Sequence, residues 1–171
     1  MKSIVLIGPP GSGKSTIGQI LAEQLEWVWI DTDTEIEQKS GKSISDIFID
    51  EGEPAFRELE TIAVKAALAH AGAIVSLGGG SVLSEATQSL LRSDEDFVVY
   101  LKVGIASAAP RIGFNRDRPL LLVNPRQQWL SLLEKRRPIY EELADFIVET
   151  DEADPVDIAS SIAAEWKKRN A

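Results

Sequence analysis

The chain has 171 residues, a length typical of one domain, and 44% of them are apolar, as in folded globular proteins. Its net charge of −9 argues against a nucleic-acid partner, because proteins that bind phosphate backbones need a basic surface. The absence of cysteine excludes disulfides, thiolate zinc sites and cysteine nucleophiles. No stretch approaches the roughly 18 apolar residues that cross a bilayer, so we expect a soluble, cytoplasmic protein without a membrane partner.

Five short apolar runs are predicted to be strands. They cover residues 3–7, 27–30, 73–77, 97–101 and 146–149, and they lack the polar alternation of half-exposed strands. Stretches with helical spacing lie between them, such as Ile17, Leu21 and Leu25 after the first run. This alternation predicts an α/β protein with a five-stranded parallel sheet between two helical layers. Segments 34–69 and 114–123 exceed a minimal alternation and are expected to reach over the sheet edge.

A phosphate-binding loop is predicted directly after the first strand. Residues 8–15 read GPPGSGKS and match G-x-x-x-x-G-K-[ST] between a strand and a helix. In such loops the backbone N–H groups and the helix N-terminus face phosphate oxygens. Lys14 is expected to reach the β- and γ-phosphates, and the Ser15 hydroxyl to hold Mg²⁺. The motif alone does not separate kinases from switch GTPases or motor ATPases, although a guanine-specific Asn-Lys-x-Asp sequence is missing.

Two aspartates, Asp31 and Asp33, end the second strand. In extended geometry their carboxylates project to the same side, toward the phosphate loop, where one is suited to metal and the other to substrate. The alternative is a pair of capping or turn aspartates.

Arg57 and the glycines 78–80 are further candidates. Arg57 lies off the apolar face of its predicted helix, and by itself it fits an ordinary solvated helix charge. Three successive glycines after a buried strand cost conformational entropy, so a close approach of the backbone to a ligand is favoured over a simple tight turn.

Together these motifs resemble those of the shikimate kinase family, in the order in which that family has them. The motifs are GPPGSGKST ending at Thr16, Asp31-x-Asp33, Phe56-Arg57-x-x-Glu60, Gly78-Gly79-Gly80, Arg118-Pro119-Leu120-Leu121 and Arg136-x-Pro138-x-Tyr140. The resemblance implies one domain over residues 1–171 with the P-loop nucleoside-monophosphate-kinase-like fold. It also implies a substrate-binding segment at about 32–62, a mobile lid at about 111–124 and a monomeric enzyme.

The implied reaction is the ATP- and Mg²⁺-dependent phosphorylation of the 3-hydroxyl of shikimate, giving shikimate 3-phosphate and ADP. On the acceptor side, Asp33 is expected to bind the hydroxyls and assist deprotonation, and Arg57 and Arg136 to hold the carboxylate. Gly79 and Gly80 are expected to offer backbone contacts.

On the donor side, the resemblance implies a nucleotide site that includes the catalytic residues Lys14 and Arg118. Its residues are Gly11, Ser12, Gly13, Lys14, Ser15, Thr16, Arg111 near the adenine, and Arg118 on the lid. Ser15 and Asp31 are expected to hold the metal, with more weight on Asp31 because Ser76 occupies a strand position that is often acidic. The alternatives are a gluconate-type or nucleoside monophosphate kinase, or a nucleotide-binding module without transfer activity.

Overall fold

The computed structural model describes residues 2–93, 95–113 and 124–171, which form alternating strands and helices. The strands are β1 (Ile4–Ile7), β2 (Val28–Asp31), β3 (Ala73–Ser76), β4 (Phe97–Lys102) and β5 (Phe146–Glu149). The helices are α1 (Lys14–Leu25), α2 (Thr32–Ser40), α3 (Ile44–Glu51), α4 (Glu53–Leu68), α5 (Glu85–Leu91), α6 (Ile105–Ile112), α7 (Pro125–Leu143) and α8 (Pro155–Arg169), with a 3-10 helix, η1 (Ser81–Leu83), after β3. Among these helices, none has the length and apolar character needed to span a membrane.

The five strands form one sheet in the order β2-β3-β1-β4-β5, and every neighbouring pair is parallel, as the apolar runs predicted. Strand β1 is central, so the chain turns to β3 on one side of it and to β4 on the other. In such sheets the crevice at the carboxyl ends, where the strand order reverses, is the usual ligand site. The register places Leu6 and Asp31 both opposite Ser76, so the ends of β1, β2 and β3 are aligned.

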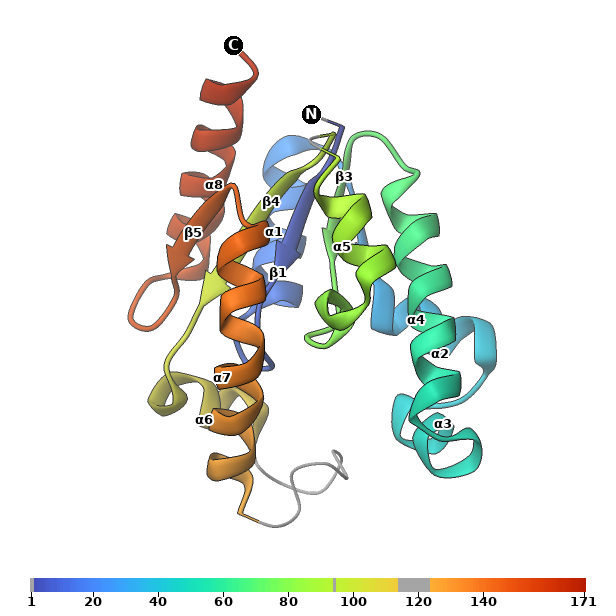
Figure 1. Cartoon of the computed structure of the whole chain (residues 1–171). Helices are drawn as coiled ribbons and strands as arrows, with labels where there is room; N and C mark the ends of the chain where they lie inside the picture. Colours follow the sequence, from blue (N-terminus) through green and yellow to red (C-terminus); the bar gives the residue numbers. More distant parts are fainter. Residues whose placement is uncertain (1, 94, 114–123) are drawn as a thin grey trace.

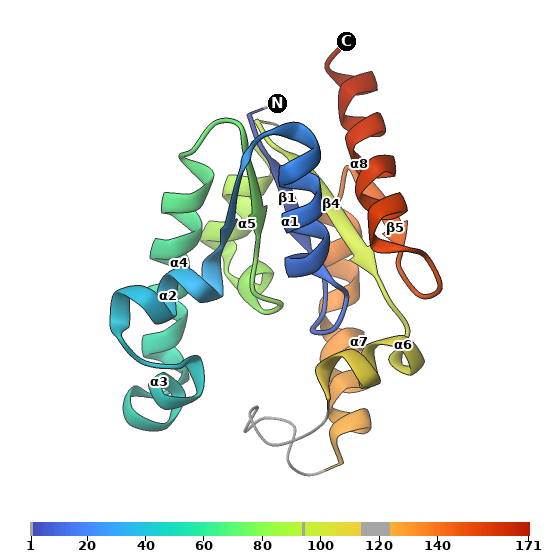
Figure 2. The ribbon, with the colours of Figure 1, turned by 180° about the vertical axis from the view of Figure 1, so that it is seen from behind.

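Helices cover both faces of the sheet, which confirms the predicted three layers. Val5 and Ile7 of β1 face the core shared with α4, α5 and α7, whereas Ile4 and Leu6 face the core shared with α1 and α8. Figure 1 shows the first helical layer in front of the sheet, and Figure 2 shows α1 and α8 from behind. Both chain termini lie at the end of the sheet opposite the phosphate loop.

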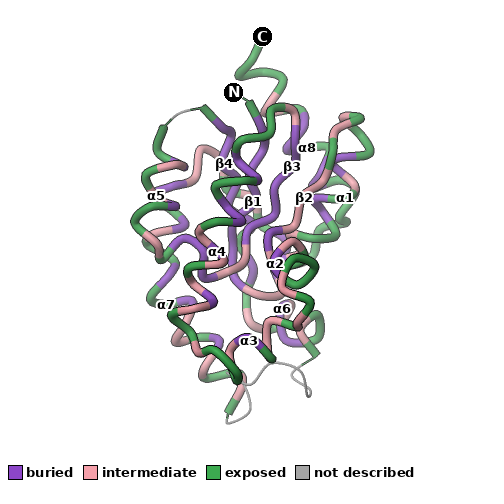
Figure 3. Tube along the Cα trace, turned by 90° about the vertical axis from the view of Figure 1, so that its right-hand side faces the viewer, coloured by how far each residue is buried: buried purple, intermediate pink, exposed green. Residues whose placement is uncertain are grey.

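Burial is complete only in the middle of the sheet. Strands β1 and β3 are fully buried, and Figure 3 shows them in purple beneath helices whose outer surfaces are green. The expectation of five fully buried strands is wrong for the two edge strands, where Val28 of β2 is 58% exposed and Ile147 of β5 is 44% exposed. A strand at an edge has a neighbouring strand on one side only, which leaves its other side open to solvent.

The long segment after β2 forms three helices with a small core of their own. Helices α2, α3 and α4 enclose buried residues that do not belong to either of the two large cores, namely Ile36, Ile47, Phe56 and Ala63. Gly52, with φ 85°, separates α3 from α4, and Pro54 lies in the first turn of α4, where its missing N–H costs nothing. Helices α2 and α3 lie beyond the carboxyl ends of the strands, next to the edge of the sheet at which ligands usually bind (Figure 1).

The start of α1 is braced against β2 and β3 by a short hydrogen-bond relay. The indole Nε1 of Trp29 donates to Ser76 Oγ at 3.0 Å, and Ser76 Oγ donates to the carbonyl oxygen of Lys14 at 2.9 Å. Gly18 leaves room for this relay, because a Cβ there would lie 2.6 Å from Trp29 Nε1 and 2.7 Å from Ser76 Oγ. Ser76 thus positions the helix that follows the phosphate loop.

We expect Gly18→Ala to lower the free energy of unfolding by about 1–3 kcal/mol, the usual cost of overpacking a core. The sign of this change in the free energy of unfolding is informative, because Gly→Ala in an unhindered helix interior stabilises by about 0.5–1 kcal/mol. Urea unfolding followed by circular dichroism measures the change. The control is Gln19→Ala at the exposed neighbouring position, expected to stay within about 0.5 kcal/mol of wild type. Equal or higher stability of Gly18→Ala would contradict the packing described.

Candidate active site

The predicted phosphate loop lies between the central strand and α1, in the context that its motif requires. Gly11 and Gly13 have φ values of 81° and 91°, in the left-handed region that favours glycine. A Cβ on Gly11 would also lie 2.9 Å from the carbonyl oxygen of Ala108. The conformation and the packing of the loop therefore both depend on these glycines.

Positive charge is concentrated where the loop meets the helix. Lys14 is the first residue of α1, and its Nζ donates to the carbonyl oxygens of Gly8 at 2.7 Å and Pro9 at 3.0 Å. Ser12 is fully buried, and Thr16 is exposed in the first turn of the helix. The N-terminus of α1 adds its own partial positive charge. The arrangement is suited to an anion such as a phosphate group.

Ser15 and Asp31 form the candidate metal site. Ser15 Oγ donates to Asp31 Oδ2 at 2.8 Å, next to the phosphate loop. No group of three or more histidine, cysteine, aspartate or glutamate residues that could hold a metal occurs within the described ranges. A hydroxyl and a single carboxylate suit Mg²⁺, which is bound through hard oxygen ligands and completes its shell with water and substrate phosphates.

Asp33 lies in the first turn of α2, so the expectation of two carboxylates projecting together from extended backbone is wrong. The reason is a cap: Asp31 Oδ1 accepts from the backbone N–H of Thr34 at 3.1 Å, which allows a helix to begin at Thr32. The two carboxylates consequently meet different partners. Asp31 contacts Ser15. Asp33 instead lies against the glycine turn, because a Cβ added to Gly78 would be only 2.7 Å from Asp33 Oδ1. The capping interpretation of Asp31 and its place beside the loop both hold.

The glycine turn after β3 brings together charged side chains from three helices. Because the turn has no Cβ atoms, a side chain from α2, one from α4 and one from α7 reach its backbone. A Cβ would lie 2.7 Å from Asp33 Oδ1 at Gly78, 3.3 Å from an Arg136 terminal nitrogen at Gly79, and 2.6 Å from an Arg57 terminal nitrogen at Gly80. These candidates, far apart in the sequence, therefore share one site beside the phosphate loop.

Arg57 is held in this site by a buried carboxylate. One terminal nitrogen of Arg57 donates to Glu60 Oε1 at 2.8 Å, and the guanidinium lies 5.3 Å from the centre of the Phe56 ring. Glu60 is only 3% exposed. A solvated helix charge would not be fixed in this way, so that interpretation of Arg57 is not supported. Sequence reasoning missed the role of Glu60, although its i,i+3 spacing from Arg57 on a helix was a usable signal.

Arg136 supplies a second, more deeply buried cation. It is 7% exposed, and among the described residues its Nε is buried without a hydrogen-bond partner. Buried guanidinium groups normally have their donors satisfied, so the open donor fits an anionic ligand. Next to it, burial raises the pKa of Tyr140 to about 12, further above neutral pH than the ordinary value of a tyrosine hydroxyl. That hydroxyl donates to the carbonyl oxygen of Gly79 at 2.6 Å.

Arg111 on α6 ties the phosphate loop to the segment after β5. Its terminal nitrogens donate to the carbonyl oxygens of Gly11 at 3.1 Å and Thr150 at 2.8 Å. The loop end that carries Gly11 is thereby fixed from the side of the sheet on which β4 and β5 lie.

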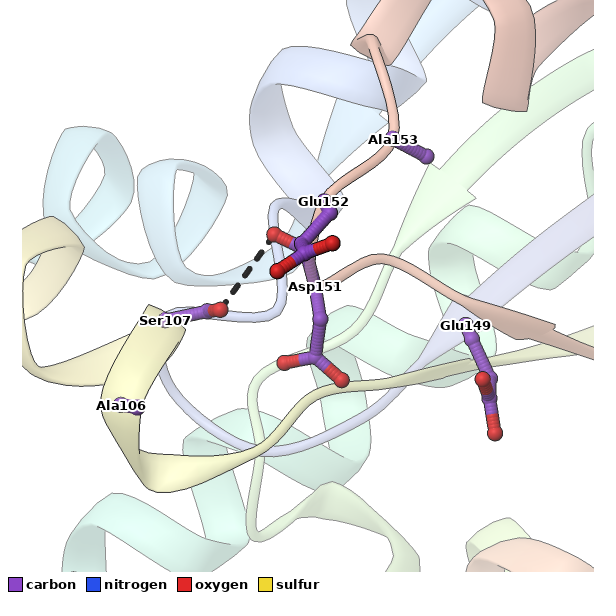
Figure 4. A pocket seen from close by; sticks show the side chains of 6 residues that line it. All are labelled: Ala106, Ser107, Glu149, Asp151, Glu152 and Ala153. Carbon is purple, nitrogen blue, oxygen red and sulfur yellow. Dashed lines mark hydrogen bonds between the residues drawn. The ribbon is translucent and has the colours of Figure 1, made fainter.

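An acidic pocket lies on the same side, between α6 and the segment after β5. Its lining residues are Ala106, Ser107, Glu149, Asp151, Glu152 and Ala153 (Figure 4). Asp151 accepts from the backbone N–H of Gly104 at 2.8 Å, and Ser107 Oγ donates to the Asp151 carbonyl oxygen at 3.3 Å. Three carboxylates would repel phosphate groups, so the pocket is no part of the phosphate-binding surface.

The predicted lid falls largely outside the described residues. Arg118 and the rest of the segment 114–123 lie there. Of the predicted lid, the described part is the end of α6, which carries Arg111, and Asn124 before α7.

Comparisons with known proteins agree with this geometry. The profile of the family described as shikimate kinase matches residues 10–167. A shikimate kinase of Thermobifida fusca is 50% identical over 161 residues, covering 94% of this chain and 92% of that protein. The solved shikimate kinase from Acinetobacter baumannii in complex with shikimate has a TM-score of 0.94 at 35% identity, over 99% of this chain and 94% of that one. A gluconokinase from Sinorhizobium meliloti, with a TM-score of 0.58 and 20% identity over 99% of this chain and 98% of its own, shares the fold alone. The chain belongs to the shikimate kinase family.

Proposed function

We propose that this protein transfers the γ-phosphoryl group of ATP to the 3-hydroxyl of shikimate, giving shikimate 3-phosphate and ADP. The observation that carries the proposal is the convergence of Asp33, Arg57 and Arg136 on the glycine turn beside the phosphate loop. Family membership and the likeness to a shikimate kinase solved with shikimate support the same acceptor.

The donor side of the proposal is the phosphate loop with Arg111. The phosphates are bound by backbone N–H groups of the loop residues Gly11, Ser12, Gly13, Lys14, Ser15 and Thr16. Lys14 leaves the loop carbonyls for the β- and γ-phosphates, where it stabilises negative charge that develops during transfer. Arg111 packs against the adenine side of the nucleotide. Ser15 and Asp31 would hold Mg²⁺, which would supply positive charge to neutralise the phosphate oxygens.

The acceptor side is built for a carboxylate attached to a polyol. Arg57 and Arg136 hold the carboxylate, each through a charge-assisted contact of about 1.5–3 kcal/mol. The Asp33 carboxylate accepts hydrogen bonds from the hydroxyls, and Gly79 and Gly80 add backbone contacts. An uncharged polyol would leave Arg136 buried without an anion, which disfavours its binding.

The chemical step then needs alignment more than strong base chemistry. The acceptor oxygen attacks the γ-phosphorus while the bond from that phosphorus to the bridging oxygen of ADP breaks, through a loose transition state. As the hydroxyl oxygen donates electron density to the phosphorus, the hydroxyl becomes more acidic and its proton passes to the Asp33 carboxylate. Arg118 remains a prediction as the lid arginine at the transferred group.

We assign the whole of residues 1–171 to one kinase domain and residues 32–62 to its acceptor-binding segment. The separate small core of Ile36, Ile47, Phe56 and Ala63 supports this segment as a structural unit. Arg57 and Asp33 lie on helices of that unit, so the unit holds two of the three charged acceptor contacts.

An acceptor panel tests the proposed function directly. With ATP and Mg²⁺, purified protein is expected to form ADP rapidly with shikimate and at least 100-fold more slowly with gluconate or AMP. The carboxylate and hydroxyls of gluconate lie on a flexible open chain that must be ordered on binding, and AMP has no carboxylate. Coupled ADP detection with product identification by mass spectrometry measures this. Equal turnover with gluconate or AMP, or tight ATP binding without any phosphorylated product, would overturn the assignment.

Replacing Arg57 tests the carboxylate contact. Arg57→Ala is expected to raise KM for shikimate about 10- to 100-fold and to change KM for ATP less than about twofold. Because this change leaves buried Glu60 without its partner, Arg57→Lys is measured beside it and is expected to show a smaller rise. The control is Arg92→Ala, which removes an exposed arginine paired with Glu142. Unchanged constants in both Arg57 variants would show that the assignment is wrong.

Replacing Asp33 tests the hydroxyl contact. Asp33→Asn keeps the shape but removes the proton acceptor, so kcat is expected to fall by about 10²- to 10⁴-fold while ATP binds as before. Rapid-quench kinetics and calorimetric ATP titration measure the two effects. Asp46→Asn is the matched control, since Asp46 is an exposed acid in the first turn of α3. A kcat within tenfold of wild type would remove Asp33 from the proton transfer.

A further inference from the structure

The helix α7 carries polar groups on the face that it buries. Its buried residues recur every three or four positions and therefore share one face; they are Trp129, Leu133, Arg136, Tyr140 and Leu143. Leucines alone would suffice to pack this face on the sheet. Beyond the expected anion contact of Arg136, the face has two more polar side chains, and each is hydrogen-bonded to a different loop of the active site.

Trp129 holds the phosphate loop. It is 1% exposed, and its indole Nε1 donates to the carbonyl oxygen of Pro10 at 2.9 Å. The backbone N–H of Ser12 donates to the carbonyl oxygen of Pro9 at 3.2 Å and closes the turn, whereas the carbonyl of Pro10, inside that turn, accepts from Trp129. A donor from a distant helix thus fixes the carbonyl.

Tyr140 holds the glycine turn. It is fully buried, it stacks on Tyr100 with 5.1 Å between ring centres, and its hydroxyl donates to the Gly79 carbonyl at 2.6 Å. Burial raises the pKa of Tyr140 to about 12, so this donor ionises even less readily than an ordinary tyrosine.

The two loops that α7 holds also touch each other. A Cβ on Gly79 would lie 3.2 Å from Cδ of Pro10 and 3.4 Å from the carbonyl oxygen of Gly8. The phosphate loop would carry the donor, and the glycine turn the acceptor. Their spacing therefore determines how far the phosphoryl group lies from the attacking hydroxyl.

We propose that Trp129 and Tyr140 are positioning residues, which from one helix fix the phosphate loop and the glycine turn at the separation that phosphoryl transfer needs. Both residues act through backbone carbonyls and need no contact with either substrate. They lie about three turns apart on α7, which continues through Pro138 as one helix from Pro125 to Leu143. A misplacement of about 1 Å between reacting groups costs on the order of 10²-fold in rate. The inference rests on the proposed function, because it assigns the donor to one loop and the acceptor to the other.

Two substitutions remove the donors. Tyr140→Phe keeps the ring, whereas Trp129→Phe leaves a smaller aromatic ring in a buried position, a loss of volume that the control Trp166→Phe shares. Trp129→Phe is expected to raise KM for ATP and lower kcat, each about tenfold, with KM for shikimate within twofold. Tyr140→Phe is expected to raise KM for shikimate and lower kcat, each about tenfold, with KM for ATP within twofold. These changes correspond to the loss of one hydrogen bond to a buried carbonyl. The opposite KM effects separate positioning from a general loss of structure.

Matched controls remove the same groups elsewhere. Trp166→Phe removes an indole Nε1 that is buried without a partner among the described residues. Tyr100→Phe removes the hydroxyl of the stacked neighbour, for which the described residues show no hydrogen bond to either loop. Both controls are expected to keep kcat and both KM values within twofold of wild type. Urea unfolding at the assay temperature measures the free energy of unfolding of all four variants and checks that each is fully folded in the assay.

The double variant completes the test. If both residues set one distance, the fall in kcat in Trp129→Phe/Tyr140→Phe is smaller than the product of the single effects. The proposal is overturned if either single variant keeps its kinetic constants within twofold of wild type, or if KM changes equally for both substrates. It is also overturned if the effects in the double variant are fully multiplicative, or if the controls show the same losses.

Failure of the proposed function is seen separately. If wild type does not phosphorylate shikimate, that function fails, and the Trp129 half is still decided by calorimetric ATP binding. A roughly tenfold weaker ATP Kd in Trp129→Phe supports the hold on the phosphate loop, and an unchanged Kd overturns it.

Discussion

Parallel pairing of β1 with β3 places the phosphate loop beside the glycine turn, and the rest of the site depends on it. The backbone N–H of Leu77 donates to the carbonyl of Leu6 at 3.1 Å, so the pairing continues up to the point where both strands end. Each strand is followed by a glycine-rich segment, and parallel strands bring such segments to one edge. Without this register, donor and acceptor groups would have no common frame.

Charge is arranged against the overall composition of the protein. A chain with a net charge of −9 nevertheless gathers cations at one crevice, with Lys14 at the phosphate loop and Arg57 and Arg136 at the glycine turn. Burial of Arg136 is costly unless an anion meets it, since charges are strongly solvated in water. For Arg57, the ion pair with Glu60 offsets part of the cost of burying its charge. The site is thus prepared for negatively charged ligands and disfavours neutral ones.

Helix α7 relates the two halves of the crevice to each other. Its buried face supplies an apolar contribution to the core, a candidate anion contact in Arg136, and hydrogen bonds to one carbonyl in each loop. Because these groups belong to one continuous helix, displacement of α7 would change both loops together. The small core of α2, α3 and α4 adds a second wall that carries Asp33 and Arg57.

The sequence by itself determined which segments form strands, the place of the phosphate loop, and the motifs that assign the chain to its family. These features are local: apolar runs, a glycine-rich turn and a lysine-serine pair have the same meaning wherever they occur. Tertiary structure decided which distant residues meet. It brought Asp33, Arg57 and Arg136 to three successive glycines, replaced the expected extended aspartates by a helix cap, and exposed the edge strands. It also gave Glu60, Trp129 and Tyr140 their partners, because burial and hydrogen bonding between segments depend on packing that no local pattern encodes.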